Sequence, residues 1–311
     1  MQRRTLLASA LATPFSSIAF AQDGKSALVG FTAATDYVPV FVGTEEGFFK
    51  KRGLTVEPKF TPLNSTFPAA IQSDSLQIGG PSPSVFLQAV DGGLDQVAIA
   101  GGSATSKGVA AFALLARAGS NIRAAQDCVG RKIGVPGLGA FLHVTFRAWL
   151  QQSGVDYRKV TFIEAAFPQH NDLLKGGTVD AVVSTEPFIS RVTETGVAYV
   201  ASYYSTFLPE GLPSSLYVTR RDWVEKNPDA VSAFRGGLAD AVAWMARPAN
   251  DVRMREHMGK YIKLPQDVLA KILILPPFPT VKVAQLDMWV KILKDQDMLR
   301  NAIDTSRLVV R

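Results

Sequence analysis

The side chains that carry most enzyme and metal chemistry are few and scattered in this sequence. It has one cysteine, Cys128, and three histidines, His143, His170 and His257. Zinc sites and nucleophilic sites need several such groups to converge, and no HExxH spacing, GxSxG elbow or GxxxxGKS/T phosphate loop occurs. A single cysteine also excludes an internal disulfide framework. We therefore expect no catalytic residue, no metal site and no cofactor, and we interpret each histidine as a surface or helix-capping residue.

Side chains suited to binding are better represented, because they stand in turns that follow predicted strands. Asp36 and Glu186 each come just after such a strand and beside an aromatic residue, and helix capping is the alternative role for both. The turn at 79–84 carries Ser82 and Ser84, again as caps or as ligand donors. In open parallel sheets, ligands lie beyond the carboxyl ends of the strands. These turns are therefore candidate binding sites.

A glycine turn at 137–142 follows another predicted strand and opens a helix. It partly matches a dinucleotide-binding fingerprint, but Leu142 replaces the third glycine and no acidic residue ends a strand about 20 residues further on. We favour the simpler interpretation that the free amides of this helix start suit an anionic group.

The elements that must position these turns alternate along the chain. Strand-like runs recur between segments of helical periodicity, which predicts an α/β protein with largely parallel sheets. After residue 218 the chain is mostly helical, and we expect this tail to pack on the first lobe. Residues 22–116 plus 215–311 would then form lobe one and 117–214 lobe two, joined by a hinge of two crossing strands with a cleft between the lobes.

The first 21 residues predict a secretory signal. Arg3 and Arg4 precede an uncharged stretch from Leu6 to Ala21, which ends in Ala-Phe-Ala before Gln22. A membrane anchor is the alternative, but the stretch is shorter than the ~20 apolar residues of a spanning helix. The arginine pair is compatible with twin-arginine export. We therefore expect a periplasmic protein.

The rest of the chain has a mild positive charge. Removing residues 1–21 leaves 33 − 2 − 27 = +4, with no run rich in lysine and arginine. Nucleic acid is therefore not an expected partner, and no further apolar stretch is long enough for direct membrane insertion.

Several segments, in this order, resemble one family of proteins. They are 36–42, 46–57, 128–135, 172–183, 186–188 and 218–228. Together they resemble the periplasmic solute-binding proteins of nitrate, sulfonate and taurine ABC importers, to which binders of pyrimidine precursors are related. The likeness covers about residues 28–250.

The resemblance implies a type II periplasmic binding protein fold, with a small organic solute held between the lobes by hinge closure and passed to a membrane permease. It also implies a monomer. The matching pocket positions are Thr35, Asp36, Tyr37, Ser82, Ser84, Gly139, Ala140, Phe141 and Glu186. The solute would be a sulfonate, an aromatic carboxylate or a heterocycle. Two carboxylates and the absence of arginine at these positions disfavour a bare anion such as nitrate and favour an aromatic or heterocyclic solute.

Two other functions remain open within the same superfamily. Enzymes that synthesise a pyrimidine precursor share the fold, but their chemistry relies on a cluster of cysteine and histidine residues, which this chain does not supply. Ligand-sensing modules of transcription regulators also share the fold. They carry a helix-turn-helix where this chain carries the predicted signal.

Overall fold

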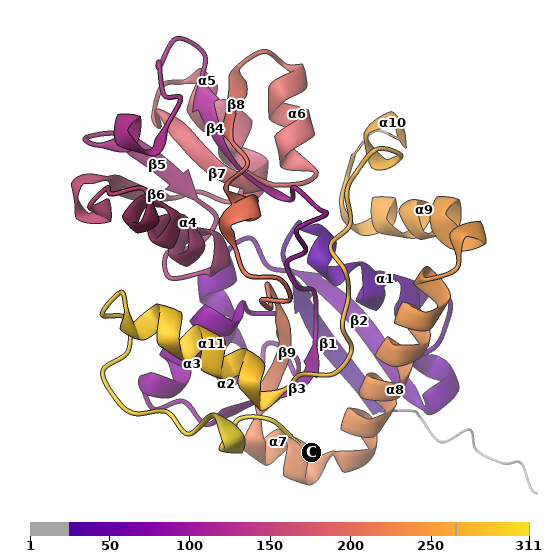
Figure 1. Ribbon diagram of the computed structural model, residues 1–311. Helices are drawn as coiled ribbons and strands as arrows, with labels where there is room; N and C mark the ends of the chain where they lie inside the picture. The colour runs from indigo at the N-terminus through magenta and orange to yellow at the C-terminus, as the bar shows by residue number, and fades with distance from the viewer. Residues whose placement is uncertain (1–24, 265, 311) are drawn as a thin grey trace, which may run out of the picture.

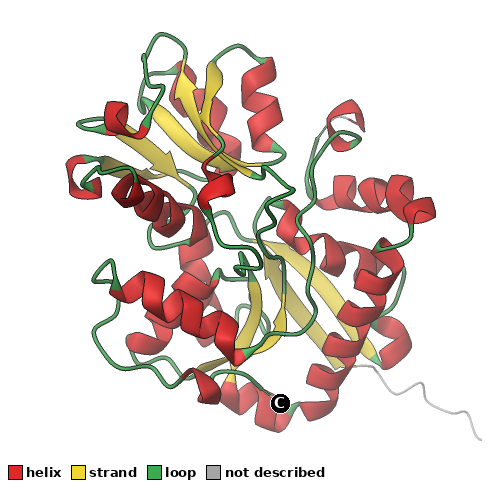
Figure 2. Cartoon of the chain, viewed as in Figure 1, coloured by secondary structure: helices red, strands yellow, loops and turns green. Residues whose placement is uncertain are grey.

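The computed structural model describes residues 25–264 and 266–310 as two α/β lobes stacked on one another (Figure 1). The predicted signal peptide at 1–21 lies outside the described residues. The strands of each lobe are sandwiched between helices (Figure 2). The predicted α/β architecture with two lobes is confirmed.

The sheet of the first lobe is assembled from two strand pairs and a short connecting segment. β1 (Lys25–Phe31) pairs in parallel with β2 (Leu54–Phe60), and β3 (Gln96–Gly101) pairs antiparallel with β9 (Leu216–Arg220). Ile78 bridges β1 and the neighbouring Gly79 bridges β9. The order across the lobe is therefore β2, β1, the segment at 78–79, β9 and β3.

The second lobe contains one sheet of five strands in the order β6-β5-β7-β4-β8. β5 runs parallel to β6 and β7, whereas β4 runs antiparallel to both of its neighbours. β9 in the first sheet and β4 in the second are antiparallel to their neighbours. Each is the strand through which the chain enters that lobe from the other lobe. The five strands are β4 (Phe112–Arg117), β5 (Lys132–Val135), β6 (Thr161–Glu164), β7 (Ala181–Thr185) and β8 (Ala198–Ser202).

The position of β4 corrects the lobe boundary expected from the sequence. The sequence analysis places residues 22–116 in lobe one, yet β4 lies inside the second sheet, between β7 and β8. The pattern of apolar runs does not show which sheet β4 joins, because a strand buried on both faces has the same apolar sequence in either sheet. We propose that the second lobe comprises 112–202 and that 102–111 and 203–215 are the crossing segments.

Helices cover both faces of the first sheet. α1, α8 and α9 pack together on one side, and α3 packs with α11 on the other (Figure 1). α1 ends at Glu45, and a separate 3-10 turn precedes Gly53. The α-helices of this lobe are α1 (Val38–Glu45), α2 (Phe67–Gln72), α3 (Pro83–Asp91), α7 (Arg221–Lys226), α8 (Pro228–Met245), α9 (Asp251–Tyr261), α10 (Gln266–Leu269) and α11 (Val283–Lys294).

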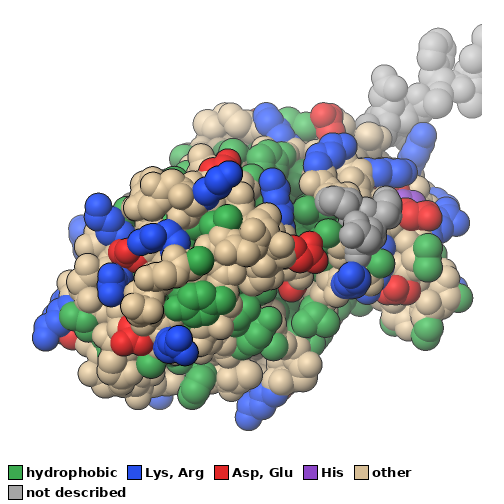
Figure 3. Space-filling model, turned by 90° about the horizontal axis from the view of Figure 1, so that it is seen from above, with side chains coloured by type: hydrophobic (Ala, Val, Ile, Leu, Met, Phe, Trp, Pro, Cys, Tyr) green, Lys and Arg blue, Asp and Glu red, His purple; other side chains and the backbone are tan. Residues whose placement is uncertain are grey.

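The second lobe carries α4 (Phe141–Gln152), α5 (His170–Lys175) and α6 (Phe188–Glu194). The apolar stripe of α4, from Leu142 to Leu150, is buried. α4 also touches α3 and α11 of the first lobe, so it lies at the junction of the two lobes. Of the helices described, none has both the length and the apolar composition that crossing a membrane requires. Acidic and basic side chains are interspersed on the face seen in Figure 3.

Candidate functional site

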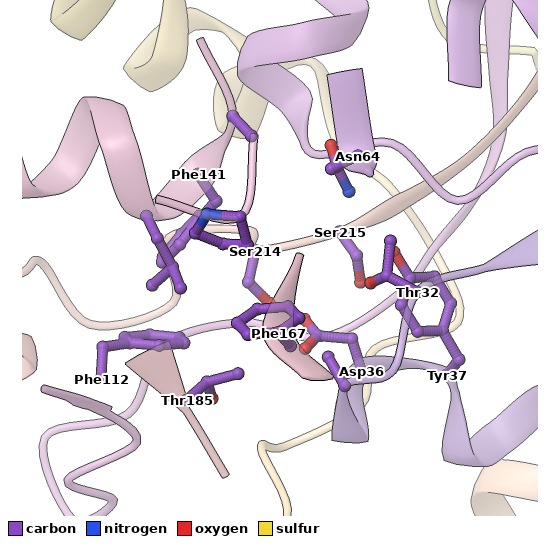
Figure 4. Close-up of a pocket in the computed structure, with 14 residues that line it drawn as sticks. Thr32, Asp36, Tyr37, Asn64, Phe112, Phe141, Phe167, Thr185, Ser214 and Ser215 are labelled. Atoms are coloured by element: carbon purple, nitrogen blue, oxygen red, sulfur yellow. The ribbon is translucent and has the colours of Figure 1, made fainter. Parts of the chain in front are cut away.

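A cavity lies between the lobes (Figure 4), and its volume together with its opening to solvent is about 420 Å³. Its walls come from segments that follow strands of both sheets and from the second crossing segment, as expected for α/β lobes. The lining residues are Thr32, Ala34, Asp36, Tyr37, Asn64, Phe112, Pro136, Ala140, Phe141, Leu142, Phe167, Thr185, Ser214 and Ser215.

Asp36 brings a carboxyl group into this cavity. It sits in the 3-10 turn Thr35–Tyr37 that leads from β1 to α1, and only 7% of its surface is exposed. Ser214 Oγ donates a hydrogen bond of 2.5 Å to Asp36 Oδ1. Burial raises the pKa of Asp36, and the hydroxyl groups of Ser214 and Ser215 lower it only in part. Within residues 25–264 and 266–310, no lysine, arginine or histidine lines the cavity, so Asp36 has no ion-pair partner from this part of the chain.

Tyr37 lies beside Asp36 in the cavity lining and packs against the turn at Gly80. Its hydroxyl donates a 2.6 Å hydrogen bond to the carbonyl oxygen of Gly80, and burial raises its pKa, so the phenol stays neutral. A Cβ on Gly80 would lie 2.2 Å from the tyrosine ring. The glycine is therefore required for the ring to lie against this turn.

The opposite wall is aromatic and comes from the second lobe. Phe112 and Phe141 have ring centroids 4.8 Å apart, and they lie across the cavity from Asp36 and Tyr37 (Figure 4). Phe167 lines the cavity and stacks on Phe188, with centroids 5.5 Å apart. The cavity thus has a polar side in the first lobe and an apolar side in the second.

The start of α4 also faces the cavity, through Ala140, Phe141 and Leu142. Gly139, with a positive φ of 76°, turns the chain into the helix, and its N–H donates to His143 Nδ1 at 2.8 Å. Burial lowers the pKa of His143 to about 3, so the ring is neutral and can accept this bond. His143, in the first turn of α4, therefore positions the glycine turn, whereas the N-cap residue Ala140 makes no side-chain cap.

The other two histidines are buried, which corrects the surface position expected for them. His170 is fully buried; its Nε2 donates to the Ala165 carbonyl, so its Nδ1 accepts from Ser184 Oγ, both at 3.1 Å. Burial lowers its pKa to about 4. His257 Nε2 lies 2.6 Å from Glu46 Oε1. These rings link structural elements.

The remaining chemistry-bearing groups do not form a reactive cluster. Burial raises the pKa of the Cys128 thiol to about 12. Within residues 25–264 and 266–310, no group of three or more histidine, cysteine or acidic side chains is placed to hold a metal ion.

Four of the nine pocket residues expected from the sequence line the cavity. They are Asp36, Tyr37, Ala140 and Phe141. The other five, Thr35, Ser82, Ser84, Gly139 and Glu186, are not among the lining residues.

Two of those five act as helix caps, the alternative that the sequence left open. Ser82 Oγ accepts from the Val85 amide at the start of α3. Glu186 accepts from the amide and the hydroxyl of Ser190, at 3.2 and 3.0 Å, in the first turn of α6. Their side chains therefore stabilise the first turns of α3 and α6.

The sequence analysis missed the lining residues that adjoin the crossing segments and strand ends. Ser214 and Ser215 directly precede β9, and Thr185 ends β7. Their place at the ends of predicted strands was a usable signal. Phe112 was missed because the sequence assigned its strand to the other lobe.

The architecture and the site define a class: two α/β lobes with a cavity between them, the fold of periplasmic binding proteins. The alkanesulfonate-binding protein SsuA from Xanthomonas axonopodis pv. citri, solved with bound MOPS, superimposes with a TM-score of 0.78 at 17% identity and covers 94% of this chain and 100% of that one. The profile of the NMT1/THI5-like family matches residues 34–250, so the chain belongs to this family. The resemblance found in the sequence is confirmed.

Curated relatives are binding proteins. The nitrate/nitrite binding protein NrtA of Nostoc sp. is 23% identical over 253 residues, which cover 73% of this chain and 56% of that protein. The bicarbonate-binding protein CmpA of Synechococcus sp. is 24% identical over 285 residues, which cover 80% of this chain and 60% of that protein. The chain thus spans little more than half the length of these relatives.

Proposed function

We propose that this protein is the extracytoplasmic solute-binding component of an ABC importer. The observation that carries the proposal is the cavity between the lobes, to which both lobes contribute side chains. A solute there touches both lobes only when they are together, so its binding favours the closed arrangement. The crossing segments at 102–111 and 203–215 serve as the hinge. The named relatives, which bind nitrate, nitrite or bicarbonate, support a binding role.

The partners follow from the same proposal. A monomer in the periplasm, exported by residues 1–21, presents its closed form to a membrane permease, which then releases the solute. Neither a cofactor nor a nucleic acid takes part.

The walls of the cavity favour a heterocyclic solute over a sulfonate or an aromatic carboxylate. Phe112, Phe141 and Phe167 offer apolar surface for a flat ring, and aromatic side chains pair well with rings in offset or edge-on contact. Asp36 offers a hydrogen-bond acceptor at the other side. No lysine, arginine or histidine in the lining neutralises an anionic group.

The enzyme alternative is less well supported by the contacts. His143 accepts a backbone amide and His170 donates to a backbone carbonyl, and neither lines the cavity. General acid–base catalysis needs a group within reach of the reacting atom.

Thermal melts of the purified exported protein test the proposal. The panel contains sulfonates, aromatic carboxylates, pyrimidines and flavins, each at up to 10 mM. A solute at about 100 times its dissociation constant adds roughly 2.7 kcal/mol, which raises the melting point of a protein of this size by several degrees. A shift confined to one compound class is the expected result. A melting point that none of these compounds changes would contradict a role in binding these classes of solute.

A further inference from the structure

Among the described residues that line the cavity, Asp36 is the only one with a charged side chain. It is more than nine-tenths buried, and its side chain accepts a hydrogen bond from a neutral hydroxyl, Ser214 Oγ. A carboxylate removed from water loses its hydration, and hydroxyl donors replace only part of it. The neutral lining supplies no counter-charge, so burial raises the pKa of Asp36, and a cation bound beside it would stabilise the ionised carboxylate.

A negative charge on Asp36 would repel the ligands named for the relatives. Nitrate, nitrite, bicarbonate and alkanesulfonate are anions. An anion a few ångströms from a buried carboxylate is repelled, and the repulsion is stronger in a poorly hydrated cavity than in water. A protonated nitrogen gives the opposite sign and supplies the N–H donors that a carboxylate accepts in short, strong hydrogen bonds.

The rest of the cavity fits the body of such a molecule. Phe112, Phe141 and Phe167 supply apolar surface for a flat ring. Thr185 lines the cavity, and only 2% of its surface is exposed. No hydrogen bond to its hydroxyl is formed within the described part of the chain, so this group remains available to a polar substituent.

We propose, building on the proposed function, that the natural solute is an organic cation, with a protonated nitrogen bound to Asp36 and a flat apolar body against the phenylalanines of the second lobe. The start of α4 lies at another part of the lining and suits an electronegative substituent of the same molecule. Asp36 is thus the residue that determines the charge preference. The site differs in that preference from the anion-binding relatives.

Three molecules of nearly equal size separate charge from shape. Benzamidinium carries a cation, benzamide is neutral, and benzoate carries an anion on the same ring. Isothermal titration of the full exported protein with each compound at pH 7.5 measures the three affinities directly. We expect benzamidinium to bind at least tenfold more tightly than benzamide, and benzoate to bind most weakly.

The Asp36→Asn variant removes the charge and keeps the shape. We expect it to bind benzamidinium no more tightly than benzamide. Asp229→Asn makes the same change at a surface position whose side chain is 90% exposed, and it should keep the wild-type order. Circular dichroism verifies that each variant is folded, and the order of the three compounds in the wild type is decisive even if Asp36→Asn does not fold.

Two other results would overturn the inference, and they are distinguishable. Tighter binding of benzoate than of benzamidinium would show an anion site, which overturns the inference and leaves the proposed function standing. If no compound of either charge binds, in this series or in the panel of thermal melts, the proposed function falls together with the inference.

Discussion

A hydrogen bond across the cleft predicts how strongly the protein itself favours contact between its lobes. Ser65, which follows β2 in the first lobe, donates from Oγ to Glu164 Oε1 at the end of β6 in the second lobe, at 2.7 Å. The same oxygen accepts the Leu138 amide at 2.9 Å. If the lobes separate in the open form, Ser65→Ala removes a contact made only when they are closed.

The magnitude follows from the partial burial of this pair. A hydrogen bond to a charged group contributes up to about 3 kcal/mol, and partial exposure to water reduces it here to about 1 kcal/mol. Because about 1.4 kcal/mol corresponds to a tenfold change, Ser65→Ala should weaken solute binding about fivefold. The change should appear mainly as faster dissociation, since the contact forms after the solute has entered.

The assay is stopped-flow dissociation of the solute that gives the largest shift in the thermal melts. Ser73→Ala is the matched control, because Ser73 is exposed and its hydroxyl bonds only to neighbours in its own segment. A double-mutant cycle with Glu164→Ala isolates the contact between the two side chains. Dissociation from Ser65→Ala at the wild-type rate, or strictly additive effects in the cycle, would refute the reasoning.

Three further perturbations test the buried polar groups. Protonation of His170 should lower the free energy of unfolding by about 3 kcal/mol as pH drops from 6.5 to 4, because unfolded His170 takes up a proton near 6.5 and the folded form only near 4, and His143, with a pKa of about 3, should lower it further; urea titrations should show a smaller loss in His170→Asn, and an equal loss would exclude a contribution from this residue. Gly80→Ala should destabilise the protein by about 1–3 kcal/mol through the clash with Tyr37, and an unchanged melting point would show that the ring has room to move. Ser214→Ala should cost about 1–3 kcal/mol, because it leaves Asp36 Oδ1 without its donor; a variant as stable as the wild type in urea would argue against that bond.

The strand and helix order could be predicted from the sequence because each element has a strong local signal. The apolar stripe of α4 and the strands that precede each turn are examples. The lobe assignment of β4 could not be predicted in the same way. Phe112–Arg117 is a short apolar strand, and only its pairing with β7 and β8, both distant in the sequence, decides which sheet it joins.

The site was predicted where a residue's neighbours in the sequence decide its position. Asp36 and Tyr37 face the cavity because they occupy the short turn between β1 and α1. Glu186 stands in an equivalent turn, but its carboxyl group reaches Ser190 in its own helix. Whether such a residue caps a helix or faces a ligand depends on the side-chain rotamer and on the neighbouring lobe, which the sequence pattern does not specify.

Small-angle X-ray scattering of the exported protein, with and without the solute that shifts its melting point most, tests the central claim most directly. Capture between two hinged lobes predicts that saturating solute reduces the radius of gyration. An identical radius of gyration in both samples, with binding verified by calorimetry in the same buffer, would contradict the claim that this protein holds its solute by closing the two lobes.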